Sequence, residues 1–219
     1  MRRGRFITLE GGEGAGKSTL ATALVKRLQD AGVNTVATRE PGGAPGAEEV
    51  RRLLVTGARD RWDPLGEALL LSAARRDHAQ RLIKPSLAAG SFVLCDRFFD
   101  STLAYQGYGH GLPRWVLNQL RTMAVGRLRP DLTLILDLPA AVGLARAQAR
   151  RGDETRFESF DLGFHERLRA GFLAIAAAEP VSGPAARWTS TGRSQVISSS
   201  RSCKNPRTNT VSTRSARRL

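Results

Sequence analysis

The sequence has few cysteines, few aromatic residues and no long apolar run. Its two cysteines, Cys95 and Cys203, cannot make a disulfide framework in a chain of 219 residues. No apolar stretch reaches the roughly 20 residues that cross a bilayer. The basic residues 1–5 lead directly into an apolar segment and lack the apolar core of a signal peptide. The chain is long enough for one α/β domain, and we expect it to be cytoplasmic and to have no membrane partner.

Acidic residues are scarce relative to basic ones, which leaves a net charge of +14. Residues 181–219 contain eight Lys or Arg and no Asp or Glu, so most of the excess lies there. The first 180 residues carry the smaller remainder, which is compatible with a protein that binds phosphate groups. We expect nucleic acid to be a partner only through the basic C-terminal segment.

Residues 11–18, GGEGAGKS, fit the phosphate-binding P-loop pattern G-x-x-x-x-G-K-[ST]. A β-rich segment, residues 6–9, precedes them, and apolar residues at helical spacing follow over 19–28. Such a loop turns backbone N–H groups around a phosphate, and the helix that follows adds its positive end. A glycine-rich turn with a chance lysine is the alternative, which the order strand, loop, helix disfavours. The predicted nucleotide-binding residues are Gly11, Gly12, Glu13, Gly14, Ala15, Gly16, Lys17, Ser18 and Thr19, with ATP and Mg²⁺ as ligands.

The rest of the first 180 residues alternates between strand and helix patterns, which predicts an α/β fold of three layers, with a parallel sheet flanked by helices. Ligands bind at the carboxyl ends of the strands in such sheets. The P-loop, Arg39-Glu40 and Asp96-Arg97 each follow a predicted strand, so we expect them to meet in one crevice. The further predicted strands are 33–38, 91–96 and 132–138, and the further helices are 48–54, 64–87 (one or two), 114–126, 140–150 and 163–179; residues 98–111 form a polar, glycine-rich connection.

Two longer segments accompany the P-loop, TREPGG at 38–43 and DRFFDSTLAYQG at 96–107. Together the three motifs resemble bacterial-type thymidylate kinases, and the resemblance spans about residues 4–180. It implies the P-loop nucleoside-monophosphate-kinase fold and transfer of the γ-phosphoryl group of ATP to dTMP with Mg²⁺. It also implies a possible homodimer. A kinase for another nucleoside or nucleotide, and a basic-tailed nucleic-acid-binding ATPase, remain as alternatives.

The chemistry of phosphoryl transfer assigns roles to several of these residues. Arginine can hold a phosphate through two parallel hydrogen bonds. By the resemblance, Arg97 and Arg39 would hold the acceptor phosphate and Arg75 would face the base. Asp96 ends an apolar strand and is predicted, with Ser18, to hold Mg²⁺; an ordinary strand-end ion pair with Arg97 is the alternative. Glu13 would lie near the acceptor phosphate or sugar, unless it is a solvated loop carboxylate.

The resemblance also implies how base and sugar are selected. Thr102 would hydrogen-bond the pyrimidine edge, and Tyr105 would crowd the sugar 2′ position; a half-buried aromatic is the alternative for Tyr105. Leu71 stands where the family usually has a phenylalanine that stacks on thymine, and leucine offers no π-face there. The remaining predicted substrate-binding residues are Glu40, Pro41, Ser101 and Gln106.

The charged residues 150–158 resemble the family's lid over ATP. Because the P-loop has Ala15 in place of a basic residue, the resemblance implies that the lid supplies the catalytic arginine, Arg151 or Arg156. The predicted catalytic groups are these two with Lys17, Arg97 and Glu13. The alternative is an ordinary solvated loop.

Residues 181–219 depart from the family, which continues with a strand and a helix. Fourteen of these residues are Ser or Thr, and only residues 195–197 hint at a strand. The composition is typical of a disordered tail, so we expect the domain to end near 180 and the last strand and helix to be missing or replaced. A shifted reading frame near residue 180 and a genuine basic tail both explain this; an unbroken frame through codon 219 would exclude the former.

Overall fold

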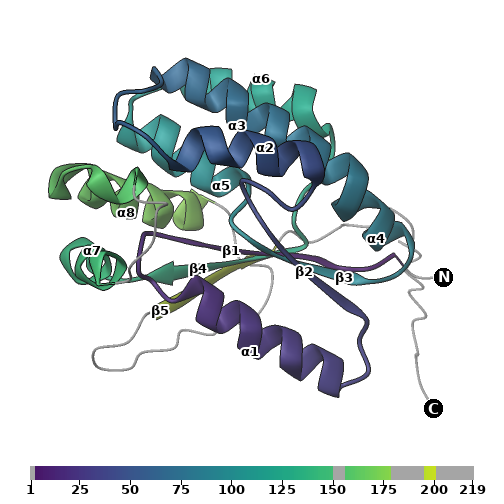
Figure 1. The fold of residues 1–219 in the computed structure, drawn as a ribbon. Helices are drawn as coiled ribbons and strands as arrows, with labels where there is room; N and C mark the ends of the chain where they lie inside the picture. The colour runs from purple at the N-terminus through teal and green to yellow at the C-terminus, as the bar shows by residue number, and fades with distance from the viewer. Residues whose placement is uncertain (1–2, 150–155, 179–194, 201–219) are drawn as a thin grey trace, which may run out of the picture.

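The computed structural model describes residues 3–149, 156–178 and 195–200. A five-stranded sheet lies between two layers of helices, with α1 (Lys17–Asp30) below it and most of the other helices above it in Figure 1. The strands are β1 Phe6–Gly11, β2 Thr35–Arg39, β3 Phe92–Asp96, β4 Leu132–Asp137 and β5 Gln195–Ser200. The other α-helices are α2 Pro45–Val55, α3 Pro64–His78, α4 Lys84–Ala88, α5 Phe99–Thr102, α6 Arg114–Val125, α7 Ala140–Gln148 and α8 Leu162–Ala178.

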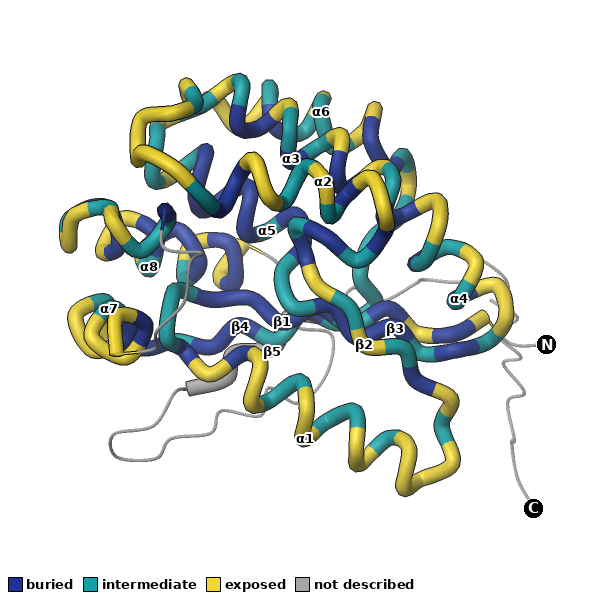
Figure 2. Tube along the Cα trace, in the orientation of Figure 1, coloured by how far each residue is buried: buried dark blue, intermediate teal, exposed yellow. Residues whose placement is uncertain are grey.

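The sheet has the order β2-β3-β1-β4-β5, and its first four strands are parallel. This confirms the expected α/β architecture with a parallel sheet flanked by helices. β1 and β3 lie inside the sheet and are buried on both faces (Figure 2), which explains their nearly continuous apolar sequences. Their register pairs Leu9 with Asp96, so the P-loop and the Asp96-Arg97 segment begin at the same edge of the sheet.

The fifth strand comes from the C-terminal segment. β5 runs antiparallel to β4, in a register that pairs Ile135 with Ile197. This differs from the expectation of an unordered tail without a last strand. Without a neighbour, the outer edge of β4 would leave a row of N–H and C=O groups unpaired. The remainder of the predicted tail, and the boundary at 180, lie outside the described residues and stay predictions.

The predicted helix over 64–87 is several helices in succession. Its start is capped, because Asp63 Oδ1 accepts a hydrogen bond from the Gly66 N–H at 2.7 Å and Pro64 follows the cap. α3 ends at His78 and continues into a π-helix, η1 (Ala79–Ile83), and then into α4. The wide turns of a π-helix are uncommon and often adjoin functional sites.

The predicted irregular connection at 98–111 is wrong. It forms α5 and a second π-helix, η2 (Leu103–Gly109), which pack between the sheet and α8. Gly109 of this segment serves close packing, because a Cβ there would lie 2.6 Å from the Phe164 ring. Tertiary packing here overrides the local preference of glycine for loops.

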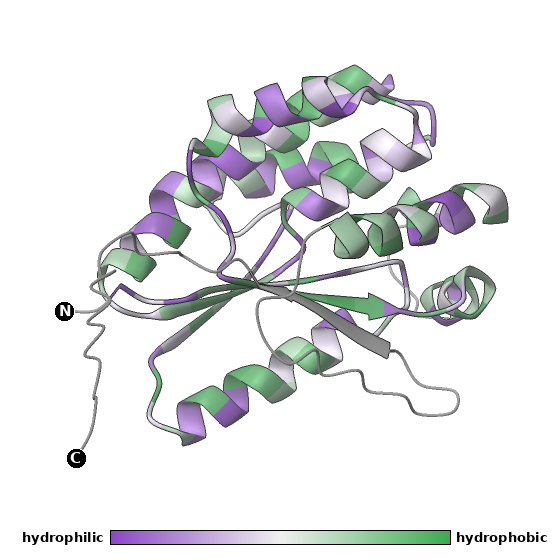
Figure 3. Ribbon diagram, turned by 180° about the vertical axis from the view of Figure 1, so that it is seen from behind, coloured by the Kyte–Doolittle hydropathy of each residue, from purple (hydrophilic) through white to green (hydrophobic). Residues whose placement is uncertain are grey.

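The main core lies between the sheet and the upper helices. Figure 3 shows hydrophobic residues both on the strands and on helices of the upper layer. Phe6 of β1 packs edge to face on Phe98, with ring centroids 5.0 Å apart. This contact places the segment after β3 against the sheet and thereby fixes the residues that follow Asp96. None of the described helices combines the length and apolar character needed to cross a membrane.

Candidate active site

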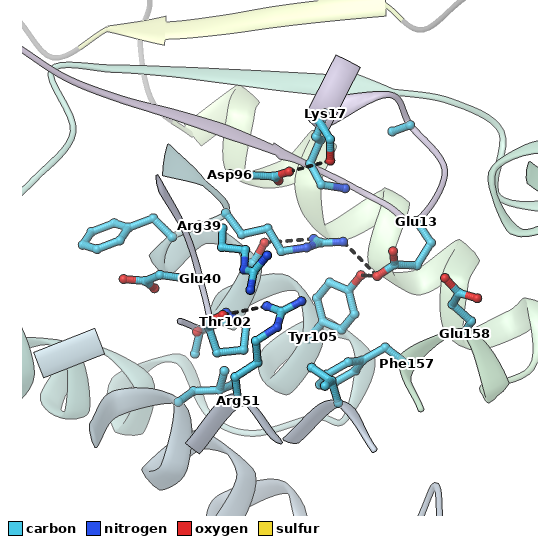
Figure 4. Close-up of a pocket in the computed structure, with 18 of the residues that line it drawn as sticks. Glu13, Lys17, Arg39, Glu40, Arg51, Asp96, Thr102, Tyr105, Phe157 and Glu158 are labelled. Atoms are coloured by element: carbon cyan, nitrogen blue, oxygen red, sulfur yellow. Dashed lines mark hydrogen bonds and ion pairs between the residues drawn. The ribbon is translucent and has the colours of Figure 1, made fainter. Parts of the chain in front are cut away.

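A cavity of about 530 Å³ opens at the carboxyl ends of β1, β2 and β3. Figure 4 shows Lys17 and Asp96 at one end, Arg51 and Phe157 at the other, and Tyr105 between them. The predicted crevice is therefore confirmed, and its volume suits a small-molecule site. The predicted residues that line it are Glu13, Gly14, Ala15, Gly16, Lys17, Ser18, Thr19, Arg39, Glu40, Pro41, Leu71, Arg75, Asp96, Arg97, Ser101, Thr102, Tyr105 and Gln106.

The P-loop wraps tightly because two of its glycines touch other backbone segments. Gly11 has a φ of 132°, and a Cβ there would lie 2.4 Å from the carbonyl oxygen of Leu136 in β4. Gly14 has a φ of 64°, and its Cβ would lie 2.0 Å from the carbonyl oxygen of Gly143 in α7. A side chain at either position would push the loop away from its support, so glycine is required by geometry.

Lys17 begins α1 with its side chain folded back over the loop. Its Nζ donates to the carbonyl oxygens of Gly11 at 3.1 Å and Gly12 at 2.8 Å. Burial, aided by the neighbouring Arg97, lowers the pKa of Lys17 to about 8, while nearby carboxylates oppose the shift. The ammonium group is thus held in the middle of the loop, where a bound phosphate would sit.

Ser18 and Asp96 form the second polar contact at this end. The Ser18 hydroxyl donates to Asp96 Oδ2 at 3.0 Å, whereas Asp96 Oδ1 is buried and has no hydrogen-bond partner among the described residues. A buried carboxylate oxygen needs a partner, and a hard cation such as Mg²⁺ takes carboxylate and hydroxyl oxygens. The pair therefore fits the predicted metal ion. The Arg97 guanidinium donates to Gly11, Ser101 and Glu13 rather than to Asp96, so the expected alternative of a strand-end ion pair is not what these hydrogen bonds form.

Arg97 is held between the P-loop and η2. Its guanidinium donates to the Gly11 carbonyl at 2.9 Å, to Ser101 Oγ at 3.1 Å and to Glu13 Oε1 at 2.8 Å. Tyr105 donates its hydroxyl to the same Glu13 oxygen at 2.6 Å. Burial alone would raise the pKa of Glu13, but Arg97 and Lys17 lower it to about 2. Glu13 is thus an ionised, paired carboxylate rather than a solvated one.

The backbone of Arg97 is unusual as well. Its φ is 69°, and among the described residues it is the one non-glycine residue in the left-handed region. The peptide N–H groups on both sides of its Cα are held, since Arg97 N donates to Leu9 O at 2.9 Å and Phe98 N donates to the buried Glu10 Oε1 at 2.8 Å. Strained backbone of this kind persists where the surroundings hold it, often at functional sites.

Arg75 is a buried arginine whose donors are aimed by fixed partners. Its Nε donates to Glu40 Oε2 at 2.7 Å, and its Nη2 donates to Thr102 Oγ1 at 3.0 Å and to the Phe98 carbonyl at 3.2 Å. The guanidinium also lies over the Phe98 ring, 5.2 Å from its centroid. These contacts bring Glu40, Arg75 and Thr102 together, as the sequence predicted.

Arg39 lies at the open rim of the cavity. Its side chain is 55% exposed and pairs with Glu48 of α2 at 3.3 Å. Glu48 also accepts the Gly43 N–H at 2.8 Å, and that hydrogen bond lowers the pKa of Glu48. The predicted pairing of Arg39 and Arg97 around one ligand would therefore combine an exposed donor at the rim with a more enclosed one held by three partners.

Arg156 does not line the cavity, which corrects the expectation that it faces ATP. Its guanidinium forms an ion pair with Glu67 of α3, and both side chains are 1% exposed. The same group donates to the carbonyl oxygens of Leu54, Ala58 and Arg59. A guanidinium held by these four partners, in a residue that does not line the cavity, is not placed to bind a phosphate there. Arg151, the other predicted lid arginine, lies outside the described residues.

Several lining residues were missed by sequence reasoning: Arg51, Val55, Phe98, Phe157 and Glu158. Phe98 directly follows Arg97, and this position beside a predicted site residue could have marked it as a lining residue. Arg51 and Val55 belong to a helix whose alternating basic and apolar residues resemble an ordinary surface helix. Leu71 lines the cavity, 9% exposed, and packs with Leu54 and Val55, as expected for the wall that the base would contact.

A P-loop and a set of arginines that open on one cavity define this protein as a P-loop nucleotide kinase. A family model described as thymidylate kinase matches residues 9–182. The chain is 59% identical over 180 residues to the thymidylate kinase of Caulobacter vibrioides, covering 82% of this chain and 86% of that protein. It is 55% identical over 180 residues to that of Bradyrhizobium sp., covering 81% and 80%. The crystal structure of thymidylate kinase from Ehrlichia chaffeensis superimposes with a TM-score of 0.66 and 39% identity, covering 80% of this chain and 88% of that one.

The chain belongs to the thymidylate kinase family. The resemblance drawn from the three motifs is therefore confirmed, and so is the fold that it implied. The family match ends at residue 182, close to the position at which the composition changes.

Proposed function

We propose that this chain transfers the γ-phosphoryl group of ATP to dTMP, giving ADP and dTDP, in the supply of dTTP. The observation that carries the proposal is that Arg97 connects the P-loop to the middle of one cavity: it bonds the Gly11 carbonyl, and it shares the Glu13 carboxylate with Tyr105, which lies between the two ends. A group in that position can neutralise charge on a phosphoryl in transit between two substrates.

The donor end would bind the ATP phosphates. The backbone N–H groups of the P-loop and the N-terminus of α1 face this end, and Lys17 supplies a positive charge. Ser18 and Asp96 would hold Mg²⁺, which supplies charge neutralisation on the phosphate oxygens when bound. Thr19 lines the same end. Lys17 would exchange its two carbonyl partners for phosphate oxygens.

The acceptor end would bind dTMP. Arg97 and Arg39 would hold its phosphate, and Glu13 would keep Arg97 aligned. Arg75 and Thr102 would face the pyrimidine edge, and Leu71 would contact the face of the ring. Tyr105 would occupy the space beside the sugar 2′ position, where a ribose hydroxyl would collide with it. Glu40, Pro41, Ser101 and Gln106 complete the wall of this end.

Of the two predicted lid arginines, Arg151 remains the proposed donor to the transferred phosphoryl. This follows from the four protein partners that hold the Arg156 guanidinium away from the cavity and from the presence of Ala15, which has no charge, in the P-loop. The lid itself, 150–158, is described only from residue 156 onward.

Exposed apolar side chains on the surface indicate a protein partner in addition to the substrates. Four large apolar side chains on α3 and α6, which pack side by side (Figure 1), are exposed by 45–71%: Leu65, Leu69, Trp115 and Met123. We propose that this face joins two copies in a homodimer, because contiguous apolar surface of this kind is commonly covered by a partner. Light scattering of the wild type and of Leu69→Glu tests it. We place the enzyme in the cytoplasm, where its substrates are found.

An acceptor panel tests the function and separates the alternatives. ADP release from Mg-ATP is measured with dTMP, dUMP, dCMP, dAMP and dGMP, and with single-stranded DNA. The proposal requires a rate that depends on dTMP and exceeds the rates with the other monophosphates. A higher rate with another monophosphate would reassign the acceptor, and stimulation by DNA alone would favour the nucleic-acid-binding ATPase.

A further inference from the structure

His78, at the end of α3, is a fully buried imidazole that the roles above leave unused. Its Nε2 lies 2.7 Å from Thr38 Oγ1, and its Nδ1 lies 3.1 Å from Glu40 Oε1. The other oxygen of Glu40 accepts from Arg75 Nε, and Arg75 Nη2 donates to Thr102 Oγ1. A continuous chain of hydrogen bonds therefore runs from Thr38, at the end of β2, to Thr102 in the cavity wall.

The chain is enclosed by protein from His78 to Thr102, whereas Thr38 at its start is half-buried. His78 is 0% exposed, and the side chains of Arg75 and Glu40 are 2% and 4% exposed. Gly43 closes over it, since a Cβ there would lie 2.4 Å from Thr38 Oγ1 and 2.5 Å from His78 Nε2. In such surroundings each polar group depends on its partners, because water does not replace a lost hydrogen bond.

The direction of the hydrogen bonds can be derived from the groups involved. The Glu40 carboxylate accepts through both oxygens, so His78 Nδ1 must carry the hydrogen that it donates. In the neutral imidazole Nε2 is then an acceptor, and Thr38 donates its hydroxyl to it. At the other end, Thr102 Oγ1 accepts from Arg75. The Thr102 hydroxyl hydrogen is thereby directed away from Arg75, so that Thr102 can donate it.

We infer that His78 is a positioning residue for base selection. Through Glu40, His78 fixes the rotamer of Arg75 and the orientation of its guanidinium. Because Arg75 donates to the Thr102 oxygen, the Thr102 hydroxyl is left to donate its hydrogen toward the cavity. Two neighbouring donors, on Arg75 and Thr102, accept a carbonyl at the pyrimidine edge and disfavour an amino group, which would leave donors facing each other. The inference rests on the proposed function, in which Arg75 and Thr102 face the base.

Matched variants of His78 test this role. Asparagine places an amide nitrogen near the position of Nδ1 and retains the bond to Glu40, whereas glutamine places it near Nε2 and loses that bond. We expect His78→Gln to raise the KM for dTMP by about tenfold and to reduce the dTMP-to-dCMP ratio of kcat/KM by a similar factor, as couplings within a buried network allow. We expect His78→Asn to stay within about threefold of the wild type in both. The KM for ATP should stay within about twofold in each variant.

Ile83→Val is the control for a general loss of packing. Ile83 is also 0% exposed and lies in the turn after His78, but it carries no polar group. Its dTMP-to-dCMP ratio should equal that of the wild type even where its thermal stability falls. Equal acceptor KM and equal selectivity in His78→Gln and His78→Asn would overturn the inference, and so would a selectivity loss in Ile83→Val of the same size.

Thr38→Val, which preserves side-chain shape, extends the test if a His78 variant does not fold. It removes the donor to Nε2, so the dTMP-to-dCMP ratio should fall by a few-fold; an unchanged ratio would overturn the inference.

Arg75→Lys separates this inference from the proposed function. If Arg75→Lys leaves the KM for dTMP unchanged, the assignment of Arg75 to the base is wrong. If it raises that KM and the His78 and Thr38 variants do not, only the role of His78 is wrong.

Discussion

Arg156 and Glu67 form a buried ion pair that joins the end of the lid to the helix beneath the acceptor end of the cavity. The second oxygen of Glu67 accepts from Gln106 Nε2 at 2.6 Å, so the pair also reaches the cavity wall. The segment after the lid is thus fixed to α3 and η2.

The first prediction follows from the burial of this pair. Replacing Arg156 by methionine leaves the Glu67 charge buried without a partner, and we expect the free energy of unfolding to fall by about 3–5 kcal/mol. Urea denaturation measures the change. Arg52→Ala is the matched control, because the ion pair of Arg52 with Glu49 is exposed and should contribute little. An Arg156→Met protein of unchanged stability but lost kcat would instead identify Arg156 as catalytic.

The second prediction concerns Arg97. Arg97→Lys keeps one charge but cannot reach the Gly11 carbonyl, Ser101 and Glu13 together. We expect kcat/KM for dTMP to fall by about 10²–10³-fold, the usual loss for a group that stabilises transition-state charge. Arg76→Lys, whose arginine donates to the Ala124 carbonyl outside the cavity, is the control. A loss of less than about threefold in Arg97→Lys would remove Arg97 from the catalytic groups.

The third prediction concerns pH and Glu10. Glu10 is fully buried and accepts from Phe98 N at 2.8 Å and Ser101 Oγ at 2.5 Å. Burial, reinforced by Asp100, raises its pKa from 4.5 to about 8, although the hydrogen bonds and Arg97 oppose the shift. The folded protein therefore keeps a proton that the unfolded chain loses above pH 4.5.

Because the folded state binds the extra proton, the contribution of Glu10 to stability is fully present below pH 4.5 and is lost as pH rises toward 8. Its slope is at most about 1.4 kcal/mol per pH unit. Glu10→Gln should flatten the decline of the unfolding free energy across this window, measured by urea denaturation at several pH values. Glu13 affects the unfolding free energy in a separate window: because its pKa is lowered to about 2, its contribution to stability is lost as pH falls below 4.5. Identical pH slopes in the wild type and Glu10→Gln would contradict the prediction.

The fourth prediction concerns Leu71. A phenylalanine at this position would present a ring to the base, and aromatic contacts add about 0.5–1.5 kcal/mol beyond burial. We therefore expect Leu71→Phe to lower the KM for dTMP by about two- to tenfold and to leave the KM for ATP unchanged. Titration calorimetry with dTMP checks the affinity directly. Weaker dTMP binding would show that the wall around Leu54 and Val55 cannot accommodate the larger side chain.

The fifth prediction concerns the metal ion. Chelation of divalent cations should abolish turnover, and Mg²⁺ should restore it. Asp96→Asn removes the charge of the buried Oδ1 that lacks a partner, and we expect it to raise the Mg²⁺ concentration needed for half-maximal activity by at least about tenfold. An unchanged Mg²⁺ requirement in Asp96→Asn would exclude Asp96 from the metal site.

Much of the site could be predicted from the sequence because its chemistry is encoded in contiguous segments. The P-loop specifies its own backbone shape through Gly11 and Gly14, and the strands before Arg39 and Asp96 bring three segments to one edge of the sheet. The predicted convergence needed only the rule for parallel sheets.

The remainder depends on contacts between residues that are distant in the chain. Arg156 was expected at the phosphates because residues 150–158 resemble the family's lid, and only its partner Glu67, in another helix, shows that it is buried. His78 and Glu10 were missed because no local pattern marks a polar residue whose partners lie far away in sequence. The helical course of 98–111 was hidden by its glycines, of which Gly109 serves packing against α8.

The measurement that tests the central claim most directly is the identity and amount of the products. The purified chain is incubated with Mg-ATP and dTMP, and ADP and dTDP are quantified by chromatography against a reaction without dTMP. We predict ADP and dTDP in equal amounts and negligible ADP without the acceptor. ADP formed at the same rate without dTMP, with no dTDP, would contradict the account and show that the cavity does not hold both substrates together.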